Sequence, residues 1–203
     1  MHRGGGSVRE KGDGSILPER PSGCFAQNTP VPFFPERTWS ETVALEPWGE
    51  PPTLRPLHAQ DSSALAAVYE RVDAALASEA ASCRACGECC RFGPDRPVLF
   101  ASALELAYLT ASAGRPAPDR APKPGGPDAP WQCPYQEGAQ CTVRAGRAMG
   151  CRTYFCEPAS RRRGEEVHAE AFDEIRRIAG RRKEGWWYGP ARFFFAQGAG
   201  AGA

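Results

Sequence analysis

The chain is organised around one stretch, Cys83-Arg84-Ala85-Cys86-Gly87-Glu88-Cys89-Cys90. This stretch places four thiols within eight residues, first as a C-x-x-C pair and then as two adjacent cysteines. Thiolates are soft ligands that suit zinc or iron–sulfur clusters and suit magnesium or calcium poorly. The stretch therefore predicts what kind of metal the chain binds before it predicts any activity.

Further cysteines along the chain complete a set of eight candidate metal ligands. They are Cys83, Cys86, Cys89, Cys90, Cys133, Cys141, Cys151 and Cys156. Two sulfurs in a C-x-x-C turn can reach one metal, a spacing that zinc and iron–sulfur sites both use. The adjacent side chains of Cys89 and Cys90 point in different directions, so either they serve two metals or one of them is a spare thiol. Eight ligands divide evenly into two tetrathiolate sites, so two metal centres remain one alternative. These two centres could be one iron–sulfur cluster and one zinc ion.

The choice between the two metals rests on the local spacing. Cys83, Cys86 and Cys89 form the C-x-x-C-x-x-C pattern of a [4Fe–4S] half-loop. Cys133, with the proline that follows it, is one candidate for a distant fourth ligand. On this ground we favour an iron–sulfur cluster and keep zinc as the alternative.

Arginines close to the cysteines in sequence are candidates for hydrogen bonding to sulfur, which would offset the negative charge of the thiolates. They are Arg84, Arg91, Arg144, Arg147 and Arg152. The alternative for each is an ordinary solvated arginine.

Composition limits the setting and the partners. The net charge is +1, which argues against nucleic acid and against an anionic membrane as partners. The sequence contains no run of eighteen apolar residues, so no transmembrane helix is predicted. Residues 1–6 lack the apolar stretch of a secretory signal, so we expect the cytoplasm of a bacterium-like cell, where clustered cysteines indicate metal sites rather than disulfides. The ninth cysteine, Cys24, stands apart and is predicted to be an unligated thiol.

Three segments follow from the distribution of prolines. Residues 1–57 contain nine prolines and show no regular period, which predicts a disordered or loosely docked arm. Residues 58–195 are predicted to form the cysteine-cluster metal-binding domain, and residues 196–203 a flexible tail. The Pro/Gly-rich residues 114–130 are expected to form an exposed loop.

Apolar periodicity predicts three helices, over residues 61–81, 102–114 and 165–182. The first begins with an N-cap at Asp61–Ser63, and the second with a capping box between Ser102 and Glu105. His168 is expected on the surface of the third helix. The aromatic residues 186–195 are expected to pack rather than to be solvated. The predicted fold class is therefore mainly α, a small irregular metal-stapled domain with a Pro-rich N-terminal extension, in which metal ligation supplies folding free energy.

The chain resembles a known family in the spacing of its cysteines and their neighbours: Cys83-x2-Cys86-x2-Cys89-Cys90, then Cys133-Pro134-Tyr135, Cys141-x-Val143 and Cys151-Arg152-x-Tyr154-x-Cys156. This pattern is similar to the YkgJ-type cysteine cluster family, whose CxxCxxCC signature belongs to a domain described as chelating zinc or iron. The resemblance covers residues 83–156 and implies that the eight cysteines are the ligands. Where family members carry Arg-Pro, this chain has Met149-Gly150.

The resemblance indicates a cofactor class more than a reaction. Flagellin lysine N-methylases carry a related cysteine cluster, but Gly4-Gly5-Gly6 neither follows a strand nor opens a helix, so it is not a nucleotide-binding loop. Two functions remain open. One is an iron–sulfur or zinc protein that supports electron transfer or modification of a protein partner; the other is a non-enzymatic structural zinc module with two tetrathiolate sites that presents a partner-binding surface. Whether the chain is an enzyme, and its oligomeric state, stay undecided at this point.

Overall fold

The computed structural model describes residues 49–81, 83, 85–94, 96–114, 129–182 and 185–198. The predicted arm as far as residue 48, Cys24 within it, and most of the predicted loop at 114–130 lie outside the described residues. Across the described ranges the chain is mainly helical with few short strands, so the coarse fold class is confirmed.

Helices form most of the framework, and short antiparallel strand pairs connect them. The helices are α1 (Ala59–Ala75), α2 (Ala77–Ala81), η1 (Glu88–Cys90), α3 (Ala103–Ala113), η2 (Arg144–Gly146), α4 (Met149–Thr153), α5 (Pro158–Ala179) and α6 (Ala191–Gly198). The strands are β1 (Arg91–Phe92), β2 (Phe100–Ser102), β3 (Trp131–Gln132), β4 (Gln136–Glu137), β5 (Gln140–Cys141) and β6 (Tyr188–Pro190). Their pairs are β1–β3, β2–β6 and β4–β5, each antiparallel.

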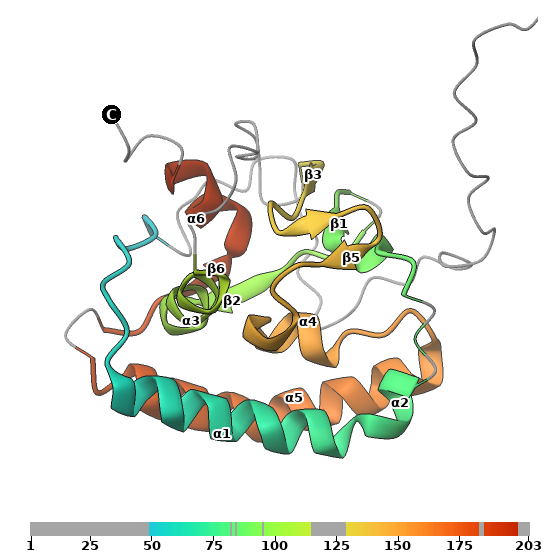
Figure 1. The fold of residues 1–203 in the computed structure, drawn as a ribbon, viewed down its shortest axis with the longest axis horizontal. Helices are drawn as coiled ribbons and strands as arrows, with labels where there is room; N and C mark the ends of the chain where they lie inside the picture. The colour runs from blue at the N-terminus through green and yellow to red at the C-terminus, as the bar shows by residue number, and fades with distance from the viewer. Residues whose placement is uncertain are drawn as a thin grey trace, which may run out of the picture.

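The long helices α1 and α5 lie side by side and run in opposite directions, with the remaining elements packed on one side of them (Figure 1). Arg71 of α1 pairs with Glu174 of α5 at 2.5 Å, and Asp61 pairs with Arg182 just after α5 at 3.3 Å. The first-helix stripe predicted from its period is confirmed, because all its members are at most 3% exposed. These residues are Leu65, Val68, Tyr69, Val72 and Leu76.

The predicted limits of the helices are confirmed in part. The capping box of α3 is present: the Ser102 hydroxyl accepts from the Glu105 amide, and the Glu105 carboxylate accepts from the Ser102 amide at 2.8 Å. The N-cap prediction for the first helix is wrong, because α1 starts at Ala59 and Asp61 lies inside its first turn. The first helix is also interrupted, since α1 ends at Ala75 and α2 resumes at Ala77.

The third predicted helix begins earlier than its apolar period indicates. The structure starts α5 at Pro158, because proline is compatible with the first turn and the Glu157 carboxylate caps the Ser160 amide at 3.0 Å. Gly164 then lies so close to α4 that an added Cβ would sit 1.8 Å from the Thr153 carbonyl oxygen. This close approach packs α4, the helix that contains Cys151, against α5.

The aromatic C-terminal segment is packed, as predicted, although its helix α6 was not expected. Trp187 and Phe195 are buried, and the ring of Phe195 contacts those of Trp131 and Tyr135. A second apolar core therefore forms around the β1–β3 pair, beside the core between α1 and α5.

The surface prediction for His168 is wrong, because its side chain is only 6% exposed. Its Nδ1 lies 3.1 Å from the Thr153 hydroxyl, which itself donates to the Met149 carbonyl at 3.1 Å. The hydrogen bond to Thr153 therefore holds the buried ring against the end of α4. Burial lowers the pKa of His168 to about 4.

This buried histidine predicts acid sensitivity. Above pH 6.5 the imidazole is neutral in both the folded and the unfolded chain, and it imposes no penalty. Between pH 6.5 and 4 the unfolded chain takes up a proton that the folded chain refuses, so the free energy of unfolding should fall by about 3 kcal/mol over that window. Urea unfolding across pH 4–8 measures the slope.

The His168→Gln variant should show a shallower pH dependence than the wild type, since its amide can still donate to Thr153 but cannot titrate. His58, whose side chain is exposed, provides the matched control as His58→Gln, which should keep the wild-type slope. Equal slopes for the wild type and His168→Gln would contradict this assignment.

Candidate metal centre

The eight predicted ligands come from four separate segments. Cys83 and Cys86 lie in the loop after α2, Cys89 and Cys90 in η1, Cys133 and Cys141 around the β4–β5 hairpin, and Cys151 and Cys156 in and after α4. Figure 1 shows β1, β5 and α4 on the same side of the molecule, and α2 beside the start of α5. Cys133 is buried, Cys83 and Cys89 are exposed, and the other five are half-buried.

A backbone hydrogen bond joins the segment that contains Cys90 to the segment that contains Cys133. The Cys133 amide donates to the Cys90 carbonyl at 2.9 Å, and β1 pairs with β3 directly beside it. The side-chain amide of Gln136, itself 1% exposed, donates to the Gly87 carbonyl at 2.8 Å. The motif loop and the hairpin are therefore fixed to each other by hydrogen bonds at both ends of η1.

The loop before η1 depends on two residues with left-handed backbone. Gly87 has φ +74°, and a Cβ built on it would meet Gln136 Nε2 at 2.6 Å and Ala139 Cα at 2.7 Å. Glycine is required here both for the conformation and for the close approach to the hairpin turn. Ala85 has φ +50°, which costs a non-glycine residue free energy and makes it a point of strain within the cysteine motif.

The hairpin places the next thiol opposite this loop. In the β4–β5 pair Cys141 lies across from Gln136, and Gly138 makes the turn with φ +60°. The Thr142 amide and hydroxyl both reach the Tyr135 carbonyl at 2.9 Å, which closes the base of the hairpin.

The side chains gather into two overlapping groups of thiols. The first, here called the inner thiol group, is defined by electrostatic interaction of Cys151 with the other three members. Its members are Cys89, Cys133, Cys141 and Cys151. Burial raises the pKa of Cys133 to about 12 and that of Cys151 well above its usual range, and the neighbouring thiols add to both rises.

The second group, here called the outer thiol group, surrounds the end of α4. Its members are Cys83, Cys86, Cys89 and Cys156. Burial raises the pKa of Cys156 to about 11, and the other thiols of the group contribute further. Cys89 belongs to both groups; a hydrogen bond with Cys90, followed by burial, raises its pKa.

These groups fit metal in their chemistry but are not closed around a point. Within the described residues, no three His, Cys, Asp or Glu side chains converge closely enough to hold a metal ion, and no two of the eight cysteines form a disulfide. All-sulfur donor sets are the kind that zinc and iron–sulfur clusters take. Each Sγ can change its direction between staggered rotamers, so the backbone arrangement fixes which thiols are neighbours more firmly than it fixes their distances.

The arginines near the cysteines have different roles. Arg84 lies outside the described residues. The guanidinium of Arg152 is buried, pairs with Asp73 and lies 4.0 Å from the centre of the Tyr69 ring, so it cross-links α4 and α1 rather than serving sulfur. Arg91 pairs with Glu88 at 3.5 Å.

Two arginines donate hydrogen bonds to the backbone carbonyls of proposed cysteine ligands. Arg147, which was among the predicted candidates, donates to the Cys151 carbonyl at 3.4 Å. Arg161 was missed, because the third helix was predicted to begin only at residue 165. It lies in the first turns of α5 and donates to the Cys156 carbonyl at 3.2 Å. An earlier start for α5 in the prediction would have placed it there. Its neighbours Arg162 and Arg163 both pair with Glu166 instead.

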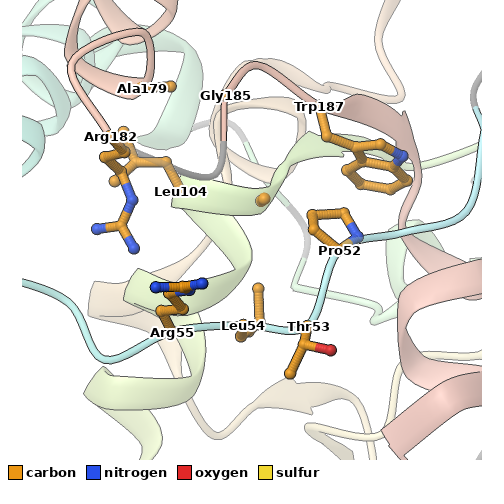
Figure 2. A pocket seen from close by; sticks show the side chains of 10 residues that line it. Pro52, Thr53, Leu54, Arg55, Leu104, Ala179, Arg182, Gly185 and Trp187 are labelled. Atoms are coloured by element: carbon orange, nitrogen blue, oxygen red, sulfur yellow. The ribbon is translucent and has the colours of Figure 1, made fainter.

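The cavity in Figure 2 does not offer a substrate site. It lies between residues 52–55, the start of α3, the end of α5 and Trp187, and no cysteine lines it. Its volume is about 10 Å³, which is room for one water molecule at most.

No family model, no curated protein and no solved structure matches the chain. The similarity to the YkgJ-type family therefore stays a prediction based on cysteine spacing. In the described residues, no helix is both long enough and apolar enough to cross a bilayer.

The contact between the motif loop and the hairpin gives a prediction. Gly87→Ala should separate the two, because the new methyl group would overlap Gln136 and Ala139, and the destabilisation should exceed that from backbone strain alone. Gly138→Ala is the matched control: its φ is also positive, but a Cβ there would meet nothing within 4 Å, so it should cost only about 1–2 kcal/mol. Urea unfolding compares the two variants. An equal loss of unfolding free energy in both would show that the close approach at Gly87 does not contribute to stability.

Proposed function

We propose that this is a metal-binding protein that holds an iron–sulfur cluster, zinc, or both through its eight clustered cysteines. The observation that carries the proposal is the gathering of thiols from four segments into two electrostatically coupled groups. Without a cation the buried thiols stay protonated and neutral, whereas a bound zinc ion or cluster would bind them as thiolates. Sulfur donors gathered at this density suit such soft metal centres.

The eight residues divide into two proposed sets of four. The outer set comprises Cys83, Cys86, Cys89 and Cys156. The inner set takes Cys90 in place of the Cys89 of the inner thiol group, and it comprises Cys90, Cys133, Cys141 and Cys151. Cys90 is assigned to the inner set because its carbonyl binds the Cys133 amide and its side chain packs, with those of Cys141 and Cys151, on the core that contains Cys133. This division assigns the adjacent Cys89 and Cys90 to different centres, one of the two alternatives that their adjacency leaves open.

The bound group would supply different chemistry in the two cases. An iron–sulfur cluster supplies one-electron transfer, and zinc in a closed tetrathiolate supplies a structural cross-link. The exposure of Cys83 and Cys89 favours a redox role at the outer set, because electron transfer to a protein partner needs an accessible edge. We therefore propose that the chain has a protein partner. We further propose that it acts in the cytoplasm and belongs to the YkgJ-type family.

A structural zinc module is the second candidate, and the local architecture favours it. The segments that carry the cysteines form strands of only two residues and helices of three to five residues. Elements this short gain little from their own hydrogen bonds, so metal ligation can supply much of their folding free energy.

Metal content separates the two candidates. Protein purified without oxygen should be assayed for iron, zinc and acid-labile sulfide per chain, with its visible spectrum recorded. Iron with matching sulfide and a brown colour is the expected result and supports the redox function. About two zinc ions in a colourless protein would leave the structural module, and the absence of both metals would refute the proposal.

The ligand assignment has its own test. Cys86→Ser should release metal and lower the thermal unfolding temperature, because one ligand of the outer set is lost. Cys24→Ser is the matched control, since Cys24 is not a proposed ligand, and it should retain both metal and stability. A Cys86→Ser protein with full metal content and an unchanged melting transition would show that the assignment is wrong.

A further inference from the structure

We propose that residues 39–48 dock within the same chain on a surface made of three aromatic side chains. The surface consists of Phe172, Trp186 and Tyr188 and is here called the aromatic triad. Residues 39–48, which lie outside the described residues, are here called the acidic segment. The inference goes beyond the proposed metal-binding function and does not depend on it, because no cysteine takes part in the contact.

The aromatic triad is a cluster of half-buried rings that all contact one another. The centre of the Phe172 ring lies 5.6 Å from that of Trp186 and 5.0 Å from that of Tyr188, edge to face in both pairs. The rings of Trp186 and Tyr188 are 5.8 Å apart and nearly parallel, with 7° between their planes. Trp187 between them is buried on the opposite side of the chain, as alternate side chains of an extended segment require. The triad therefore offers ring faces and edges to an aromatic or apolar side chain.

Exposed arginines border the aromatic triad. Arg176 lies one helical turn after Phe172 in α5, so the two share a face of that helix. Arg177 and Arg181 follow, and all three arginines are exposed. Within the described residues none of the three forms an ion pair, and the exposed Asp173 offsets only part of their charge. An aromatic surface with positive charge at its border is complementary to an acidic segment that also carries apolar side chains.

The acidic segment has this composition. It contains Glu41 and Glu46 but no Lys or Arg, and its apolar residues include Trp39, Leu45 and Trp48. Residues 1–38, by contrast, contain five basic and four acidic residues, so they lack this complementarity. Of the two alternatives that the prolines leave open for the arm, the chemistry of residues 39–48 favours docking.

The point at which the arm joins the described chain lies close to the triad. Pro52 lines the small cavity of Figure 2 together with Trp187, the residue between Trp186 and Tyr188. An extended chain spans at most about 3.5 Å per residue, so residue 48 lies within about 14 Å of Pro52. So short a tether gives an effective concentration on the order of millimolar, at which weak contacts are enough for binding within one chain.

Photocrosslinking in the full-length chain tests where the acidic segment lies. Leu45→p-benzoylphenylalanine introduces a photoreactive side chain inside the segment, and Phe25→p-benzoylphenylalanine is the control outside it. Cleavage after Lys and Arg releases the triad in two peptides, residues 164–176 and 184–192. After irradiation the Leu45 variant should form a crosslink within one chain to one or both peptides, identified by mass spectrometry, and the Phe25 variant should not.

Charge reversal tests how the segment is recognised. Introducing Arg176→Glu and Arg177→Glu into the photoreactive Leu45 variant should lower the yield of this crosslink about 2- to 10-fold, because exposed ion pairs each contribute little free energy. Adding Glu41→Arg and Glu46→Arg should restore the yield.

The matched control makes the same change of charge at the other end of α5. Arg162→Glu with Arg163→Glu should leave the yield of the crosslink unchanged. Crosslinks to other peptides, equal crosslinking of the Leu45 and Phe25 variants to the triad, or covalent dimers would each overturn the inference, the dimers by assigning the surface to a second copy of the chain. The proposed function would stand in all three cases, because it is tested by metal content.

Discussion

The two halves of the cysteine set meet at one close contact, where the backbone of Gly87 lies against the turn of the β4–β5 hairpin. A side chain on residue 87 would leave no room for the Gln136 amide or for Ala139. The contact also satisfies a buried polar group, since the Gln136 amide donates to the Gly87 carbonyl. Because the Cys133 amide binds the Cys90 carbonyl just beyond, this short region fixes η1, with Cys89 and Cys90, relative to the hairpin. Loss of that approach would leave the motif loop without a partner.

A buried carboxylate connects this cysteine region to the helical framework. Glu105 in α3 accepts hydrogen bonds from the Ser102 amide and hydroxyl, from the Met149 amide at the start of α4, and from the Tyr69 hydroxyl of α1. Burial raises the pKa of this carboxyl, and the donors oppose the rise. Met149 begins the helix that carries Cys151, so Glu105 helps to determine where that thiol lies. The apolar framework and the thiol groups are therefore one cooperative structure rather than two independent layers.

Sequence periodicity predicts the parts of this structure that depend on local chemistry. The buried stripe of α1 and the Ser102–Glu105 capping box follow from spacing alone, and both are present. The burial of His168 could not be found in that way, because it depends on packing against α4 near Gly164. The start of α5 was missed because it depends on Pro158 and the Glu157 cap rather than on apolar spacing. The eight cysteines are predicted as one set of ligands from their spacing, and their grouping in space differs from their order in the sequence. Cys156, the last of them, interacts with the first two because the chain after α4 comes back beside α2, where α5 begins.

This mixed grouping has a consequence for how the two sets would behave. Cys133 is buried in the inner set, whereas Cys83 in the outer set is exposed, so solvent reaches the two sets unequally. Electrostatic interaction is stronger where water is excluded, which makes the inner set the more sensitive to uncompensated charge and the outer set the more accessible to a partner. Cys89 interacts with both sets and is hydrogen-bonded to Cys90, so a change of charge at the exposed set is felt at the buried one. The adjacent pair that is hardest to place on a single metal is therefore the element that couples the two.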